Sequence, residues 1–175
     1  SPSAGALARW QVAPPEGAKT SFRRRALANW IVDTEQGAGQ LVARVIVNRL
    51  WQHHFGRGIV ATPNDFGMQG LRPSHPELLD YLATELIRGG WKLKPIHQLI
   101  MNSSAYRQSS RWSEAGQRED PENQWLWRFS PARLEAEVIR YNMLAVSGEL
   151  DEKMFGPGSL DEGHKRRSIY FMVKR

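Results

Sequence analysis

The sequence predicts a mainly α fold, an orthogonal multi-helix domain with a small β element near the C-terminus. Several segments carry apolar residues at the three- and four-residue spacing of one helix face. Glycine and proline punctuate the chain where these patterns start and stop. The clearest β-prone run is the last one, Ser168–Lys174, and it is short. These observations favour helices packed on one another over a sheet-based fold.

Five helices are expected, in order: one after Thr20 or Ser21, one over about residues 40–55, one from Ser74, one near Pro95, and one over residues 131–147. Gly56 follows the second helix and is expected to end it. Ser74, Pro76 and Glu77 fit a capping box at the start of the third. Ser130 before Pro131 is the same type of start signal for the fifth. Residues 107–124 are polar and are expected to form an exposed loop with at most a helical turn.

The domain organisation follows from where these patterns lie. Residues 1–20 are rich in proline, glycine and alanine, which predicts a linker or N-terminal extension. Residues 21–175 are expected to form a single mainly helical domain. The final run Ile169–Arg175 has the pattern of a strand cut short, so we expect a domain truncated at its C-terminus.

Composition narrows the classes of function. The formal net charge is +6, but lysine and arginine are spread along the chain, so solvated or internally paired charges are favoured over a nucleic-acid interface. The chain has no cysteine, which excludes disulfides, thiolate metal sites and covalent c-type haem attachment within it. No apolar run approaches the roughly 20 residues of a membrane-spanning helix.

The segment Val42–Gly58 is the most informative part of the sequence. It is apolar on nearly every side of a helix, which is typical of a buried helix, yet it carries arginine, asparagine and histidine. Buried charges must be paired or hydrogen-bonded. Glu135 on the expected core face of the 131–147 helix is therefore a candidate partner for Arg44 or Arg49. A buried salt bridge that only fixes helix register remains the alternative to a functional pair.

We expect a ligand cleft between the 41–55 helix, the 56–75 loop and the 131–147 helix, because a long glycine- and proline-rich loop inside a compact domain is usually functional or mobile. The candidate ligand-binding residues are Arg44, Asn48, Arg49, His53 and Arg57. An enzyme is the alternative, with His54 or His75 as acid and base and Asp65 or Glu135 as partner. No metal is expected, since adjacent histidines on a helix point about 100° apart. A purely structural or interaction domain is a further alternative.

Eight blocks of this sequence closely resemble the C-terminal domain of unknown function in planctomycete cytochrome-c-associated proteins. The blocks are Arg24–Ile31, Ala43–Val60, Thr62–Gly67, Pro73–Asp80, Gly90–Lys94, Ser103–Ser109, Arg133–Glu137 and Arg167–Tyr170. The resemblance covers nearly all of residues 20–175. It implies a large, exported multi-domain protein in which a cytochrome-c-like module precedes this domain in the same polypeptide.

The resemblance implies an exported, periplasmic location and a redox-linked context, with haem held upstream and no cofactor in this segment. It assigns no catalytic residue. We therefore expect a non-haem module that binds an anionic or carbohydrate ligand.

Overall fold

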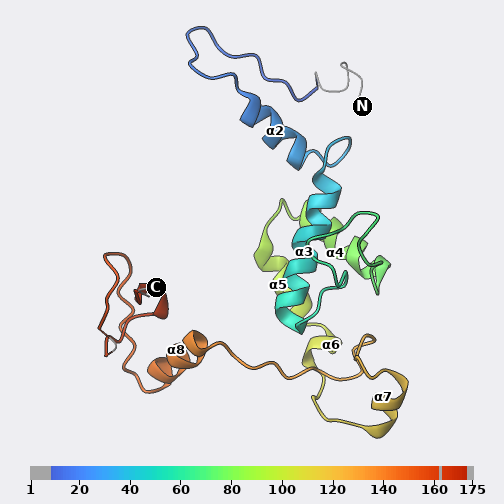
Figure 1. Cartoon of the computed structure of the whole chain (residues 1–175), viewed down its shortest axis with the longest axis vertical. Helices are drawn as coiled ribbons and strands as arrows, with labels where there is room; N and C mark the ends of the chain where they lie inside the picture. The colour runs from blue at the N-terminus through green and yellow to red at the C-terminus, as the bar shows by residue number, and fades with distance from the viewer. Residues whose placement is uncertain (1–8, 162, 173–175) are drawn as a thin grey trace. The chain divides into compact units, whose positions relative to one another are not determined.

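The computed structural model describes residues 9–161 and 163–172, and these are mainly helical, as the sequence predicts (Figure 1). The elements run in the order α2 (Arg23–Val32), α3 (Gly39–Phe55), α4 (Pro76–Arg88), α5 (Leu93–Met101), α6 (Ser104–Arg107), α7 (Glu114–Glu119), α8 (Ala136–Val146) and the short 3₁₀ helix η1 (Ser168–Tyr170). The chain divides into two compact units, Ser1–Ser130 and Pro131–Arg175, and each is described by itself.

The core of the first unit lies between α3 and α4, with α5 against both (Figure 1). Leu79, Leu82 and Leu86 recur on one face of α4 at helical spacing, and all three are buried. Ala43 and Val47 of α3 provide a small-residue surface on which α4 packs closely. The remaining core members are Trp51, Ile59, Val60, Ala83, Ile96 and Ile100.

The helix α3 is half-exposed, which corrects the expectation of a helix buried on all sides. Its buried residues follow one stripe, and Asn48 is the buried polar side chain among them. Arg44 is partly exposed and Arg49 is exposed, because long side chains carry their charged heads to water while their stems cover apolar surface. The predicted end of the helix is confirmed: Gly56 has φ 82° and its N–H bonds to the Gln52 carbonyl.

Two predicted helix starts are wrong, for the same physical reason. The Ser74 hydroxyl donates to the Ile59 carbonyl and contacts His75 Nδ1, and α4 begins after His75 without a side-chain cap. The Ser130 hydroxyl lies 2.9 Å from Asn123 Nδ2, and α8 begins at Ala136, five residues beyond Pro131. In both cases a contact distant in sequence uses the hydroxyl that local sequence assigned to a cap.

The second unit has no buried residue among those described. Arginines hold its irregular backbone instead: Arg166 donates to the carbonyls of Lys153, Phe155 and Pro157, and its guanidinium lies 3.6 Å from the centre of the Tyr170 ring. Arg140 similarly donates to the carbonyls of Arg166 and His164.

The predicted β element is reduced to two isolated bridges, Asp151 with Arg166 and Ser159 with Phe171. Part of the expected strand forms η1, and residues 173–175 lie outside the described part of the chain. A ladder is not available here because Arg166 takes up three backbone carbonyls and Pro157 lacks an N–H.

Candidate functional site

The C-terminal end of α3 provides an aromatic floor. Trp51 and Phe55 lie one turn apart and stack with ring centroids 4.2 Å apart. Tyr106 meets the Phe55 ring edge-on, with a centroid distance of 5.8 Å. Because Trp51 is almost completely buried, its ring is held in one orientation beneath the chain that follows the helix.

Asn48 fixes the path of that chain. Its Nδ2 donates to the Val60 carbonyl at 3.0 Å, and its Oδ1 accepts the Val60 N–H at 2.8 Å, so one side chain satisfies both backbone groups of a buried residue. Gly58 allows this approach, since a Cβ there would lie 2.6 Å from the Val60 oxygen and 2.7 Å from Asn48 Nδ2. Gly56 is therefore required for its left-handed backbone conformation, whereas Gly58 is required because a side chain there would clash with Val60 and Asn48.

The far end of the 56–75 loop returns to the same place. Ser74 donates its backbone N–H to the Ile59 carbonyl at 2.9 Å, and its hydroxyl lies 2.9 Å from His75 Nδ1. The imidazole of His75 is therefore held at the head of α4 without capping the helix. Its ring meets Trp125 edge-on at 5.3 Å.

A loop over residues 120–126 closes the site from the other side. The Asp120 carboxylate accepts the backbone N–H groups of Gln124 and Trp125, at 2.9 and 2.7 Å. The Asp120 carbonyl accepts the N–H of Asn123 and the indole N–H of Trp127. Asp120 thus accepts from three backbone N–H groups of the loop and from the indole of Trp127, in a segment with no regular secondary structure.

Two residues of this loop have left-handed backbone conformations, Asn123 with φ 53° and Leu126 with φ 56°. Asparagine tolerates this region, but for leucine it costs about 1–2 kcal/mol. The Leu126 carbonyl accepts a hydrogen bond from Gln108 Nε2 at 2.7 Å, and Asn123 Nδ2 donates to the Arg128 carbonyl. Such strain persists where the surroundings determine the conformation, and it is common at ligand sites.

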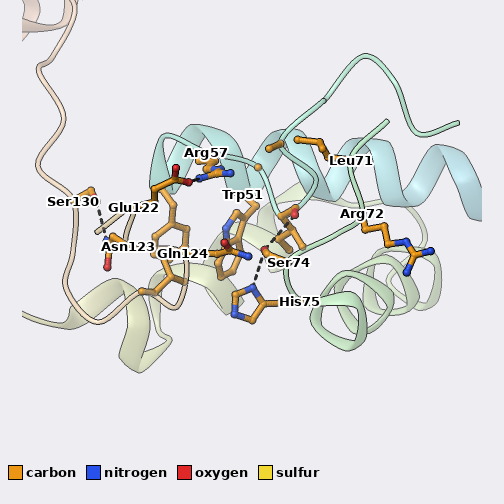
Figure 2. A pocket seen from close by; sticks show the side chains of 15 residues that line it. Trp51, Arg57, Leu71, Arg72, Ser74, His75, Glu122, Asn123, Gln124 and Ser130 are labelled. Atoms are coloured by element: carbon orange, nitrogen blue, oxygen red, sulfur yellow. Dashed lines mark hydrogen bonds and ion pairs between the residues drawn. The ribbon is translucent and has the colours of Figure 1, made fainter. Parts of the chain in front are cut away.

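These segments enclose a pocket of about 460 Å³ (Figure 2). Its apolar side is built from Trp51, Phe55, Ile59, Leu71 and Leu126. Arg57 and Glu122 are paired at this pocket, with Nη1 and Oε2 2.7 Å apart, and His75 and Gln124 also line it (Figure 2). The other lining residues are Gly58, Ala61, Arg72, Ser74, Asn123 and Ser130.

Of the residues proposed from sequence, Arg57 and His75 line this pocket. Asn48 lies beneath it, fully buried and with both amide atoms engaged. Residues 122–130 supply the wall that the sequence analysis placed on residues 131–147. Two of the three expected parts, the end of the 41–55 helix and the 56–75 loop, do meet at the pocket.

The other proposed ligand-binding residues lie elsewhere. Arg44 donates to the Asp80 carboxylate at 2.7 Å and Arg49 to the Asn64 side chain at 2.8 Å, so both candidates for pairing with Glu135 have partners within the first unit. His53 is exposed on α3. Glu135 is an exposed residue that immediately precedes α8 in the second unit.

The candidate catalytic residues do not line one pocket together. Asp65 accepts the Gly67 N–H through its carboxylate, so it stabilises a local turn of the 56–75 loop. His54 Nε2 and His97 Nδ1 lie 2.8 Å apart, joining α3 to α5. Burial, with smaller contributions from the imidazoles of His97 and His53, lowers the pKa of His54 below its usual value of 6.5.

Neither a metal cluster nor a membrane helix is found in the part of the chain that the structure describes. No group of three or more histidine, aspartate and glutamate residues there is arranged to hold a metal ion. No described helix is both long enough and apolar enough to span a bilayer. The chemistry of the pocket therefore rests on its aromatic, amide, hydroxyl, imidazole and paired charged groups.

Fold and site together define a helical domain with a half-open, mixed apolar and polar pocket. The chain belongs to the PSD1 family of proteins of unknown function (DUF1553), whose family model matches residues 23–175. Comparison with curated proteins and with solved structures gave no significant match. The family match agrees with the resemblance to a C-terminal domain of unknown function.

Sequence reasoning missed the 120–126 loop, which contributes Glu122, Asn123, Gln124 and Leu126 to the pocket. Its polar composition predicted an exposed loop but did not indicate that the loop contacts the pocket. One available signal was the aromatic pair Trp125 and Trp127 directly after the polar run, because tryptophan in a loop needs an apolar neighbour. Trp127 has one: a Cβ on Gly116 of α7 would lie 2.5 Å from its ring.

Proposed function

We propose that this domain binds a small anionic or sugar-like ligand in the pocket between the end of α3, the 56–75 loop and the 120–126 loop. The observation that carries the proposal is the pocket itself: about 460 Å³, with an aromatic and aliphatic floor and many polar side chains in the rest of its lining. Small-molecule sites have volumes in this range, and the polar lining suits a ligand that is itself rich in polar groups.

Binding is favoured over catalysis by the partners of the polar groups. The Glu122 carboxylate is paired with the Arg57 guanidinium, so it does not face another side chain as an acid or base partner. His75 Nδ1 is in contact with the Ser74 hydroxyl, and no hydrogen bond among the described residues joins His75 to a carboxylate. The arrangement of an activated nucleophile, a base and an orienting acid is therefore not assembled here.

The wider context of the proposal rests on the resemblance of the sequence. On the basis of that resemblance, we propose that the domain is a module of an exported, redox-linked protein. A cytochrome-c-like domain upstream in the same polypeptide would hold any haem. The absence of cysteine in all 175 residues fits this division, since covalent c-type attachment needs cysteines.

The test uses the tryptophans as reporters. The chain has seven, and each contributes one indole N–H signal to a ¹H–¹⁵N spectrum of the labelled protein. We expect titration with glucose, glucuronate, glucose 6-sulfate or inorganic sulfate to shift the signal of Trp51 and the backbone signals of Arg57, His75 and Gln124. The signal of Trp30, which lies outside this pocket, serves as the internal control. If these probes and longer neutral and anionic oligosaccharides all leave the pocket signals in place, the proposal is wrong.

A further inference from the structure

The charges at the rim bear on which ligand class the pocket accepts. Arg57 and Glu122 are 2.7 Å apart and neutralise each other, while both side chains stay more than half exposed and therefore reachable. An anion that approached Arg57 would meet the Glu122 carboxylate at the same place, which costs Coulomb energy. Arg72 is the other cation of the lining, and its guanidinium extends to one side of the group around Trp51 (Figure 2).

A neutral hydroxyl group fits this pair better. A hydroxyl donates one hydrogen bond and accepts others, so neighbouring hydroxyls on one molecule can donate to Glu122 and accept from Arg57 at once. Gln124 adds a side-chain amide, which has one acceptor oxygen and two donor hydrogens. Among the described residues, this side chain forms no hydrogen bond; only the backbone N–H of Gln124 does. A ligand rich in hydroxyl groups satisfies all three side chains without leaving a charge unpaired.

Trp125 supplies an apolar surface at the margin of the same pocket. Its side chain is 65% exposed, although its neighbours Gln124 and Leu126 both line the pocket and its ring touches His75. The bond from its backbone N–H to Asp120 fixes its main chain, and the His75 ring meets the indole edge-on. An exposed indole beside polar groups suits a ring that is apolar on its faces and polar at its edge.

We infer that the pocket takes a neutral oligosaccharide, whose hydroxyl groups bind Arg57, Glu122 and Gln124 while a sugar ring stacks on Trp125. This inference rests on the proposed function and names the ligand class of the same site. It chooses the uncharged sugar over the anion, because the paired charges at the rim disfavour an anion and the exposed indole favours a ring.

The experiment compares neutral and anionic probes of equal length on the full chain. The neutral probes are cellohexaose, xylohexaose, mannohexaose and maltohexaose, and the anionic ones are hexagalacturonate and a heparin hexasaccharide. We expect at least one neutral probe to shift the Trp51 and Trp125 indole signals and to bind in calorimetry, with no response to the anionic probes. The Trp125→Ala variant is expected to weaken that binding about tenfold or more.

Two further variants sharpen the result. Trp112→Ala removes another exposed tryptophan, 55% exposed, whose sequence neighbours do not line the pocket as those of Trp125 do, and is expected to bind the neutral probe like the wild type. Glu122→Gln leaves Arg57 without its counter-charge. This variant is expected to bind the neutral probe more weakly and the anionic probes more tightly than the wild type does.

The outcomes separate the two proposals. Binding of the anionic probes alone, with shifts at Trp51, overturns the choice of a neutral sugar and keeps the ligand pocket. Neutral binding that survives Trp125→Ala overturns the stacking role. A failure of all four neutral probes also overturns the inference, whereas the proposed function fails only if the monosaccharides, sulfate and anionic probes leave the pocket unchanged as well.

Discussion

Asn48 is a single residue on which the geometry of the pocket depends. It is fully buried, and its side-chain amide forms hydrogen bonds with both the N–H and the C=O of Val60, as a neighbouring β-strand would. A buried amide of this kind contributes less by its own hydrogen bonds than by preventing two backbone groups from being left unpaired. The side chain thus holds the loop that carries Arg57 and Ile59 against α3.

Asn48→Ala is expected to lower the free energy of unfolding by about 2–4 kcal/mol, because it leaves the Val60 N–H and C=O unsatisfied. Urea denaturation followed by tryptophan fluorescence measures the change. Asn64→Ala is the matched control: Asn64 is exposed and accepts a bond from Arg49, so its loss is expected to cost within about 0.5 kcal/mol. Equal effects of the two substitutions would contradict the role given to Asn48.

His54 predicts a pH dependence of stability. Its pKa is lowered in the folded protein, chiefly by burial, so below pH 6.5 the unfolded chain binds protons that the folded chain does not. The stability linked to His54 is therefore complete above about pH 6.5 and is lost as the pH falls through the lowered folded value.

Denaturation midpoints at pH 7.5, 6.5 and 5.5 measure this dependence. The wild type is expected to lose more stability toward pH 5.5 than His54→Phe, which has no proton to gain at this position. A matched His53→Phe variant, which removes an exposed neighbour, is expected to keep most of the wild-type slope. If His54→Phe leaves the slope unchanged, other groups account for it.

At the scale of elements, the α3–α4 pair supports both the core and the pocket. Leu82→Ala is expected to cost about 2–5 kcal/mol, because the side chain is 1% exposed and its loss leaves a cavity in the helix interface. Leu41→Ala removes the same atoms at a site that is 50% exposed and is expected to cost far less. Thermal unfolding of both variants provides the comparison, and similar shifts would show that this interface is not the core.

The elements that local pattern determines were predictable from the sequence. The helix α3 ends at Gly56 and α4 buries Leu79, Leu82 and Leu86 because periodicity and a left-handed glycine act within a few residues. The starts of α4 and α8 and the 120–126 loop were not predictable in this way. The residues before α4 and the 120–126 loop are held by hydrogen bonds from Ser74 to Ile59 and from Gln108 to Leu126, which join residues 15 and 18 positions apart. The segment before α8 is held by the bond from Asn123 to Ser130.

The candidate site shows the same division. Arg57 and His75 could be proposed because they lie beside the glycine-rich end of a helix and at the start of another. Glu122 and Gln124 could not, since a polar loop looks the same in sequence whether it faces water or a pocket. The arginines of the 41–55 helix suggested a buried pair with Glu135. In the structure, Arg44 instead pairs with Asp80 on the neighbouring helix α4.

At the scale of the whole molecule, the two units differ in what stabilises them. The first has a continuous apolar core, and the second has no buried residue among those described and is held by arginine bonds to carbonyls. Hydrogen bonds exposed to solvent open with low free energy, so the stability of the chain is not uniform. The two units are expected to respond differently to the same perturbation.

Native-state hydrogen exchange on the intact chain tests this difference. Amides of α3 and α4 are expected to exchange only through global unfolding, and those of α8 many times faster. Arg166→Ala is expected to abolish the remaining protection over residues 151–170 and to leave the exchange of α4 unchanged. Loss of protection in α4 in the same variant would mean that the units unfold as one.

The loop over residues 120–126 has a consequence for how this family diversifies. Its shape is secured by Asp120, Asn123 and Gly116, whereas the side chains of Gln124 and Trp125 are left out of that framework. Selection can therefore exchange the recognition residues without rebuilding the scaffold beneath them. Among relatives, we expect positions 116, 120 and 123 to be invariant and positions 124 and 125 to drift, with ligand preference changing along lineages while the fold is inherited intact.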